Sequence, residues 1–316
     1  MQKKIEQLLE QVNQTYPGTV MTRVGDDHDG KIHLDRVRQS ALADRILLEL
    51  PDSTEADFLL GNELLKMLLS FNGITPQIFF ALTFKDEGLD QQLIQIATRM
   101  HRTVVHAISY QELAKQGIIT ADTVKAYQAG VEELSLEDDQ PDSESLWRLL
   151  VVMDALVFAH NAENSDNLLA TLQKNYPLAY QAAKEIVEPI FAADLKQSRQ
   201  IRSQMVRVFD AVDKTLDGWH LPTVNARQYV TLTSVLSERQ LKQPVRQLFD
   251  IFHTQMYDYR TGQTAFVGLF KNDQQNSFVI TPPADKAESA KFFKELYALP
   301  TVDLFKKLAL PYIERK

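Results

Sequence analysis

Four polar side chains interrupt an otherwise apolar stretch, residues 58–71. Asn62, Lys66 and Ser70 repeat every four residues, and Glu63 is next to the first of them. Because a helix has about 3.6 residues per turn, this spacing predicts one polar strip on a helix that is buried on most of its other sides. Glu63 could act there as a general base, and Lys66 could stabilise negative charge.

Residues 62–66 read Asn-Glu-Leu-Leu-Lys and resemble the H-E-x-x-H helix of zincin-type metallopeptidases. In that family two histidines one turn apart bind zinc, and the glutamate activates a zinc-bound water. The resemblance covers residues 19–115 and includes a preceding strand and Gly73, which would end the helix. It also implies a further metal ligand on the next helix, near a Glu-His pair, where this chain has Val105 and His106.

Two departures from the family motif change the expected chemistry. Asn62 offers a neutral amide oxygen instead of an imidazole nitrogen, and Lys66 carries an ammonium group that repels a divalent cation. Zinc binding and hydrolysis by the zinc mechanism are therefore not expected, and no metal or other cofactor is predicted. We expect Lys66 to pair with Glu63 instead, near the position that the resemblance gives to the metal.

The resemblance thus implies a non-catalytic, metallopeptidase-like protein with a binding or regulatory role. Glu63 is then vestigial, and a peptide or protein partner could bind near Asn62 or add to a strand at residues 77–84. Two alternatives stay open: a metal-free enzyme with Glu63 as general base and Lys66 or His106 as charge stabiliser, or a helical scaffold in which these residues do not converge. The whole chain also resembles the bacterial IpaB/EvcA family, which implies no mechanism.

Other polar groups favour structure over chemistry. Residues 26–29 (Asp-Asp-His-Asp) lack the spacing and terminal glutamate of a calcium loop, so a solvated turn is expected. His101 and His106 are five residues apart and do not share a helix face. The basic run at residues 196–207 has no interleaved aromatic residues, so a solvated helix face is favoured over a nucleic-acid site. No G-x-S-x-G elbow or glycine-rich phosphate loop is present.

Composition excludes further classes of protein. The 316 residues contain no cysteine, which excludes disulfides, thiolate catalysis and sulfur-ligated metals. The 34 basic and 42 acidic residues give a net charge of -8, which disfavours nucleic-acid binding. No stretch reaches the roughly 20 apolar residues of a membrane span, and residues 1–11 show helical spacing instead of a signal peptide's apolar run. A cytoplasmic protein is expected, and its oligomeric state is not indicated.

The expected fold is α+β and mostly helical. Residues 19–24 and 31–35 read as a hairpin, and residues 45–50 and 77–84 as further strands, which together predict a small N-terminal mixed sheet beside the buried helix. A capping motif at residues 52–55 would begin that helix, and Asn72-Gly73 would end it.

The C-terminal half is expected to be helical, with one late β-hairpin at residues 264–281. An acidic, proline-containing stretch at residues 137–144 is the best linker. It predicts a zincin-like α+β part, residues 1–136, and a helical part, residues 145–316, packed on the first.

Overall fold

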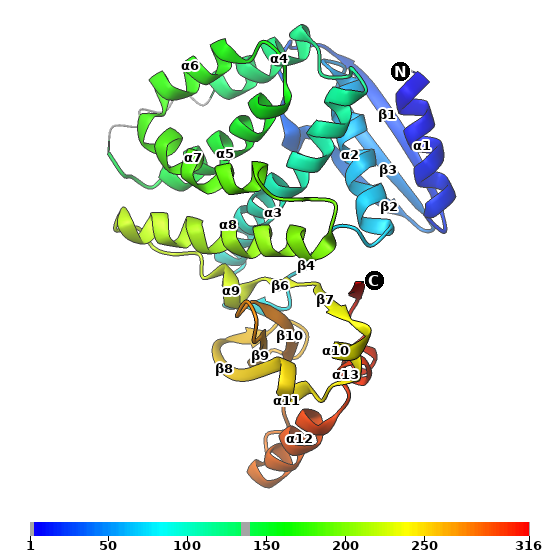
Figure 1. Ribbon diagram of the computed structural model, residues 1–316, viewed down its shortest axis with the longest axis vertical. Coiled ribbons are helices and arrows are strands. Elements are labelled where there is room, and N and C mark those ends of the chain that lie inside the picture. Colours follow the sequence, from blue (N-terminus) through cyan, green and yellow to red (C-terminus); the bar gives the residue numbers. More distant parts are fainter. Residues whose placement is uncertain (1–2, 134–139, 316) are drawn as a thin grey trace. The chain divides into compact units, whose positions relative to one another are not determined.

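The structure is a computed structural model that describes residues 3–133 and 140–315. It confirms the α+β, mostly helical fold class (Figure 1). The chain forms two compact units: unit 1 comprises Met1–Gly73 and Arg102–Ala192, and unit 2 comprises Ile74–His101 and Ala193–Lys316. These units differ from the predicted division into residues 1–136 and 145–316, because the chain leaves unit 1 after residue 73 and returns at residue 102. The predicted linker lies partly outside the described residues.

Unit 1 begins with a three-stranded mixed sheet. Its strands are β1 (Thr19–Asp27), β2 (Arg38–Leu42) and β3 (Arg45–Asp52), in the order β1-β3-β2. The central strand β3 runs parallel to β1 and forms a hairpin with β2. The predicted hairpin of residues 19–24 and 31–35 is therefore wrong, because the second segment contains only the beginning of a short 3-10 turn, Leu34–Arg36.

The true hairpin turn carries none of the usual sequence signals. Leu42 pairs with Arg45, so the turn is Ala43-Asp44, and Ala43 has a φ of 57°. Two-residue hairpin turns of this kind usually contain Asn-Gly, Asp-Gly or another glycine. The glycines that suggested a turn after residue 24 lie instead at the end of β1 and in the connection that follows it.

The core of unit 1 lies on one face of this sheet. In β3, Ile46, Leu48 and Leu50 are buried and alternate with more exposed residues. Helix α1 (Lys3–Thr15) packs on α2 (Ala56–Phe71) and on β1. The other helices that contribute to unit 1 are α3 (Glu87–Lys115, from Arg102 onward), α4 (Ala121–Glu132), α5 (Ser145–Asn161), α6 (Asp166–Asn175) and α7 (Pro177–Phe191).

A side chain from α1 covers the free edge of β1. Asn13 accepts a hydrogen bond from the Val20 N–H at 2.6 Å and donates one to the Val20 carbonyl at 3.1 Å, so its amide takes the place of a neighbouring strand. We expect Asn13→Ala to lower the free energy of unfolding of unit 1 by about 1–2 kcal/mol, because both backbone groups lose their partner. Urea denaturation measures this. Gln11→Ala, on the exposed side of α1, is the control, and an equal effect of both changes would contradict the expectation.

Helix α2 is the predicted buried helix, and it ends as predicted at Asn72-Gly73, where Gly73 has a φ of 62°. Its start differs from the prediction, because no capping motif forms at residues 52–55. Asp52 accepts hydrogen bonds from two backbone N–H groups outside the helix. Glu55 precedes the helix in the left-handed region, with a φ of 51°, and does not cap it.

Unit 2 contains the predicted late hairpin, formed by β9 (Thr264–Phe270) and β10 (Asn276–Ile280). This hairpin belongs to an antiparallel sheet of order β10-β9-β8-β5, with β8 (Phe249–Asp258) and β5 (Leu82–Thr83). Two smaller sheets pair β4 (Ile78–Phe79) with β6 (Thr231–Leu232), and β7 (Ser234–Ser237) with β11 (Tyr312–Arg315). The predicted single strand at residues 77–84 is therefore two strands of two residues each, in different sheets.

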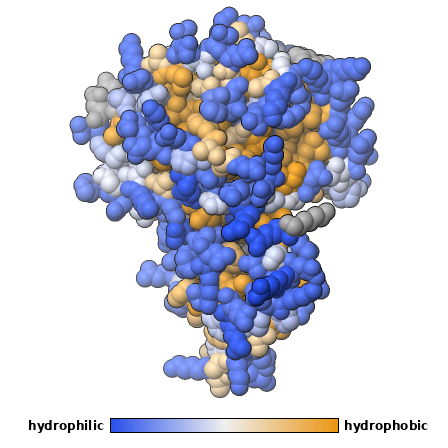
Figure 2. Space-filling view, in the orientation of Figure 1, coloured by the Kyte–Doolittle hydropathy of each residue, from blue (hydrophilic) through white to orange (hydrophobic). Residues whose placement is uncertain are grey.

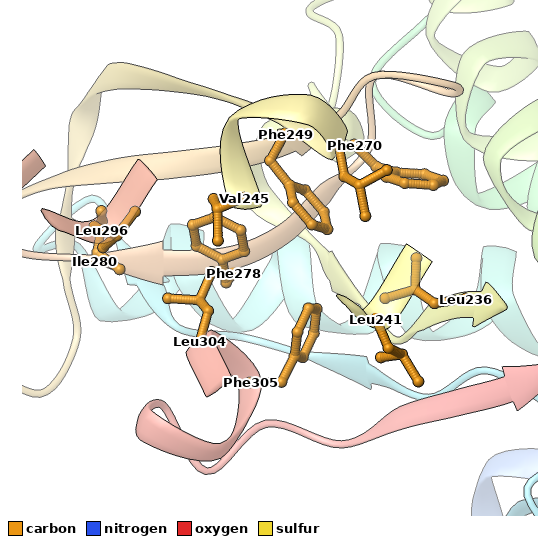
Figure 3. Close-up of a cluster of buried hydrophobic side chains, with 11 residues drawn as sticks. Leu236, Leu241, Val245, Phe249, Phe270, Phe278, Ile280, Leu296, Leu304 and Phe305 are labelled. Atoms are coloured by element: carbon orange, nitrogen blue, oxygen red, sulfur yellow. The ribbon is translucent and has the colours of Figure 1, made fainter. Parts of the chain in front are cut away.

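Along the sequence, helices alternate with the strands of unit 2. They are the first part of α3, α8 (Ser198–Gly218), α9 (Ala226–Tyr229), α10 (Glu238–Lys242), α11 (Val245–Leu248), α12 (Lys286–Ala298) and α13 (Thr301–Lys307). A hydrophobic cluster forms a core around Phe249, whose ring lies 5.4 Å from Phe270, 5.2 Å from Phe278 and 6.1 Å from Phe305 (Figure 3).

Hydrophilic residues cover most of the face shown in Figure 2, and hydrophobic residues are visible between them. Among the described helices, none is long and apolar enough to cross a membrane.

Candidate functional site

The polar strip of α2 meets α3 inside unit 1. Asn62 and His106 are each 2% exposed, and Asn62 Nδ2 lies 3.3 Å from His106 Nε2. The zincin resemblance implies a metal ligand at the position of Asn62 and a further one near Val105 and His106, where the glutamate of the family is absent. In this protein the two side chains contact each other directly.

The orientation of the Asn62 amide determines which nitrogen of His106 carries the proton. Ser109 donates its hydroxyl hydrogen to Asn62 Oδ1 at 2.6 Å, so the Asn62 amino group faces His106 and donates to Nε2. The proton of the neutral imidazole is therefore on Nδ1. From there it is donated to Asp154 Oδ1 at 2.6 Å.

Asp154 is the central acceptor of this network. Its carboxylate lies on α5 and also accepts hydrogen bonds from the hydroxyl groups of Tyr110, at 3.1 Å, and Tyr127, at 2.5 Å. Both tyrosine rings pack on Phe158, with centroid distances of 5.6 Å and 4.0 Å. Through Asn62, His106, Tyr127 and Asp154 the network joins α2, α3, α4 and α5.

Burial and neighbouring charge act in opposite directions on this network. Burial lowers the pKa of His106, although Asp154 acts to raise it. For Asp154 burial acts to raise the pKa, but His106 and the two tyrosine hydroxyls outweigh it, and the pKa is lowered. Burial raises the pKa of Tyr110 well above its usual value. At neutral pH the network therefore holds the Asp154 carboxylate, a neutral His106 imidazole and a neutral Tyr110 phenol.

Glu63 and Lys66 form the ion pair that their spacing suggested. Lys66 Nζ lies 2.5 Å from Glu63 Oε1, and each side chain is only 14% exposed. Burial lowers the pKa of Lys66, although Glu63 acts to raise it. Within the described residues no hydrogen bond joins Glu63 to His106. The three candidate catalytic residues therefore form two groups, the Glu63–Lys66 pair and the His106 network.

The site residues do not fit zinc. Asn62 directs its amino group at His106, and the ammonium group of Lys66 donates a hydrogen bond to the Glu63 carboxylate. The two positions of the motif histidines, 62 and 66, therefore offer no lone pair of the kind that zinc prefers. In the part of the chain that the structure describes, no group of three or more His, Asp or Glu residues could hold a metal ion.

Sequence reasoning missed Ser109, Tyr110, Tyr127 and Asp154. One signal was available, because Asp154 is the only charged residue in the apolar run of residues 149–159. A single carboxylate in such a run predicts a buried, paired charge. The tyrosines carry no comparable signal, since tyrosine is frequent in cores.

Acidification should weaken unit 1 through His106, which faces Asp154 with the charges of Lys66 and Arg102 nearby. An unfolded histidine titrates near pH 6.5. Between that pH and the lower folded pKa the unfolded chain binds one more proton than the folded one, so the free energy of unfolding falls as the pH falls. Urea midpoints measured from about pH 7.5 to about pH 5 should show this fall, and His106→Gln should reduce its slope. An unchanged slope would contradict the neutral imidazole.

The Asp154 carboxylate acts in a different pH range. Because its pKa is lowered in the folded state, its contribution to the free energy of unfolding is lost only below about pH 4.

The structure also places two other features that the sequence analysis considered, the basic run at residues 196–207 and His101. Arg202, in the basic run, is 3% exposed; it pairs with Asp273 at 2.9 Å and donates to the carbonyls of Leu232 and Thr233. The expected solvated face is therefore wrong at that position. The Nε2 atom of His101 lies 2.8 Å from the Pro76 carbonyl oxygen.

No family model, curated protein or solved structure compared with this chain matches it.

Proposed function

We propose that this protein is a zinc-less, metallopeptidase-like protein of the bacterial cytoplasm that acts by binding and not by hydrolysis. The contact between Asn62 and His106 is the observation that supports this most. The two residues are 44 positions apart; the zincin resemblance relates Asn62 to a zinc ligand and puts His106 in the Val105-His106 pair, near the expected position of a further ligand. In this proposal the hydrogen bond between them lies near the place of the lost metal ion.

The Glu63–Lys66 pair supports the same proposal. A general base needs an available carboxylate oxygen beside the proton that it accepts. Here the ammonium group of Lys66 neutralises Glu63 in a largely buried setting. The metal-free enzyme is supported by one observation, the lowered pKa of Lys66, which is a common property of catalytic lysines.

The proposed partner is a protein or peptide. Nucleic acid and membrane are not part of the proposal. Neither is strand addition at residues 77–84, because β4 and β5 are only two residues long and offer few free backbone groups.

Restoring the motif histidines tests the proposed relationship. We expect Asn62→His combined with Lys66→His to bind one zinc ion, because His106 would supply a third ligand beside the new pair. Removing that ligand by His106→Gln in the same background should weaken zinc binding. Zinc content after dialysis, and competition with a chromogenic chelator, measure both.

A surface pair of histidines is the matched control. Gln91 and Gln95 are exposed and four residues apart on α3, so Gln91→His with Gln95→His gives a site with two ligands only. If the restored motif binds zinc no more tightly than this surface pair while the variant remains folded, the scaffold alternative is favoured and the metallopeptidase relationship fails.

A further inference from the structure

A polar hollow of about 780 Å³ lies in unit 1, at the ends of two parallel strands. Asp27 is the last residue of β1 and Asp52 the last of β3, and both line the hollow together with Pro51. The volume is within the range of small-molecule sites.

Backbone hydrogen bonds fix the loop that forms the hollow. Asp52, which is 6% exposed, accepts hydrogen bonds from the N–H groups of Asp29, at 2.9 Å, and Thr54, at 2.6 Å. The Thr54 hydroxyl accepts another from the N–H of Gly30 at 3.0 Å. The loop is therefore held in place without a ligand, which lowers the entropy cost of binding one.

Two groups of opposite charge remain available in the hollow. Asp29 is paired with Arg36, and the Asp52 carboxylate is occupied by backbone N–H groups. Within the described residues, neither the Asp27 carboxylate nor the Arg38 guanidinium group forms a hydrogen bond or an ion pair through its side chain. Both side chains are exposed, so one ligand that carries a positive and a negative group can reach both of them.

We propose that the hollow binds a small zwitterion, an amino acid or a short peptide with free ends. The ammonium group binds Asp27, and the carboxylate binds Arg38, whose planar guanidinium group can form two parallel hydrogen bonds with it. His28 and His33 line the same hollow and can accept or donate further hydrogen bonds to the peptide backbone. This binding site lies outside α2 and does not depend on the proposed function.

Titration calorimetry with the full chain tests the proposal, with the dipeptide Ala-Ala as the probe. We expect saturable binding of Ala-Ala, and a loss of affinity of about tenfold or more when either its amino end is acetylated or its carboxyl end is amidated. Asp27→Asn and Arg38→Gln should each cause a loss of similar size, because each removes one of the two charges.

Arg45→Gln is the control, because Arg45 is an exposed arginine at the opposite end of β3 and does not line the hollow. It should leave the affinity unchanged. The proposal is overturned if Ala-Ala shows no saturable binding, if the capped peptides bind as tightly as the free one, or if Arg45→Gln weakens binding as much as Arg38→Gln. Since wild-type protein is the starting point, failure here is distinct from failure of the zinc experiment.

Discussion

Asp154→Ala is expected to lower the free energy of unfolding of unit 1 by about 3–5 kcal/mol. The change removes the shared acceptor of three hydrogen bonds, which His106, Tyr110 and Tyr127 donate to a carboxylate inside unit 1. Since whole domains are stable by only about 5–15 kcal/mol, unit 1 would be close to unfolding.

The two tryptophans allow unit 1 to be measured separately. Trp147 belongs to unit 1 and Trp219 to unit 2, so urea denaturation in a Trp219→Phe background reports unit 1 by fluorescence. Asp122→Ala is the control, because that side chain is 80% exposed and its pairing with Lys125 should contribute less than about 1 kcal/mol. Equal losses in the two variants would show that the Asp154 network contributes nothing beyond a surface charge.

Phe249→Ala should have a comparable effect on unit 2, a loss of about 3–5 kcal/mol. Phe249 is fully buried, and the rings of Phe270, Phe278 and Phe305 surround it (Figure 3). Truncation would leave a cavity that these rings cannot close without leaving their rotamers.

Phe252 on the same strand is a matched control for this prediction. Its side chain is 51% exposed, so Phe252→Ala removes the same atoms with little loss of burial and should cost less than about 1 kcal/mol. Trp219 fluorescence in a Trp147→Phe background reports unit 2. If Phe249→Ala and Phe252→Ala lower the free energy of unfolding equally, the hydrophobic cluster is not the main source of stability in unit 2.

Patterns of short range were enough to predict many of the elements. The apolar periodicity of α2 and its glycine stop are local signals, and so are the two strands of the late hairpin. Strand pairing was not predictable in the same way. The turn at Ala43-Asp44 has no glycine, and the parallel pairing of β1 with β3 brings together segments that no local pattern relates.

The candidate site could be predicted only where its residues are close in sequence. Glu63 and Lys66 are three residues apart on one helix, and their pairing follows from helical geometry. Asp154 is 48 residues from His106, and its contact depends on how α5 packs against α3, which the sequence does not state. The division into two units was also predicted wrongly, because residues 74–101 belong to unit 2, and the rest of unit 2 begins only at residue 193.

This interleaving of the two units sets the order in which the chain can fold during synthesis. Unit 1 cannot be complete until the segment that ends at Ala192 has emerged from the ribosome, and residues 74–101 must wait until then for the rest of unit 2. A fragment of residues 1–136 would contain His106, Tyr110 and Tyr127 but not Asp154. It would therefore lack the carboxylate that accepts their hydrogen bonds in the full chain. No single cut leaves both units whole, because a cut after Gly73 divides unit 1 and a cut after Ala192 divides unit 2, so limited proteolysis at one site should leave at most one unit intact.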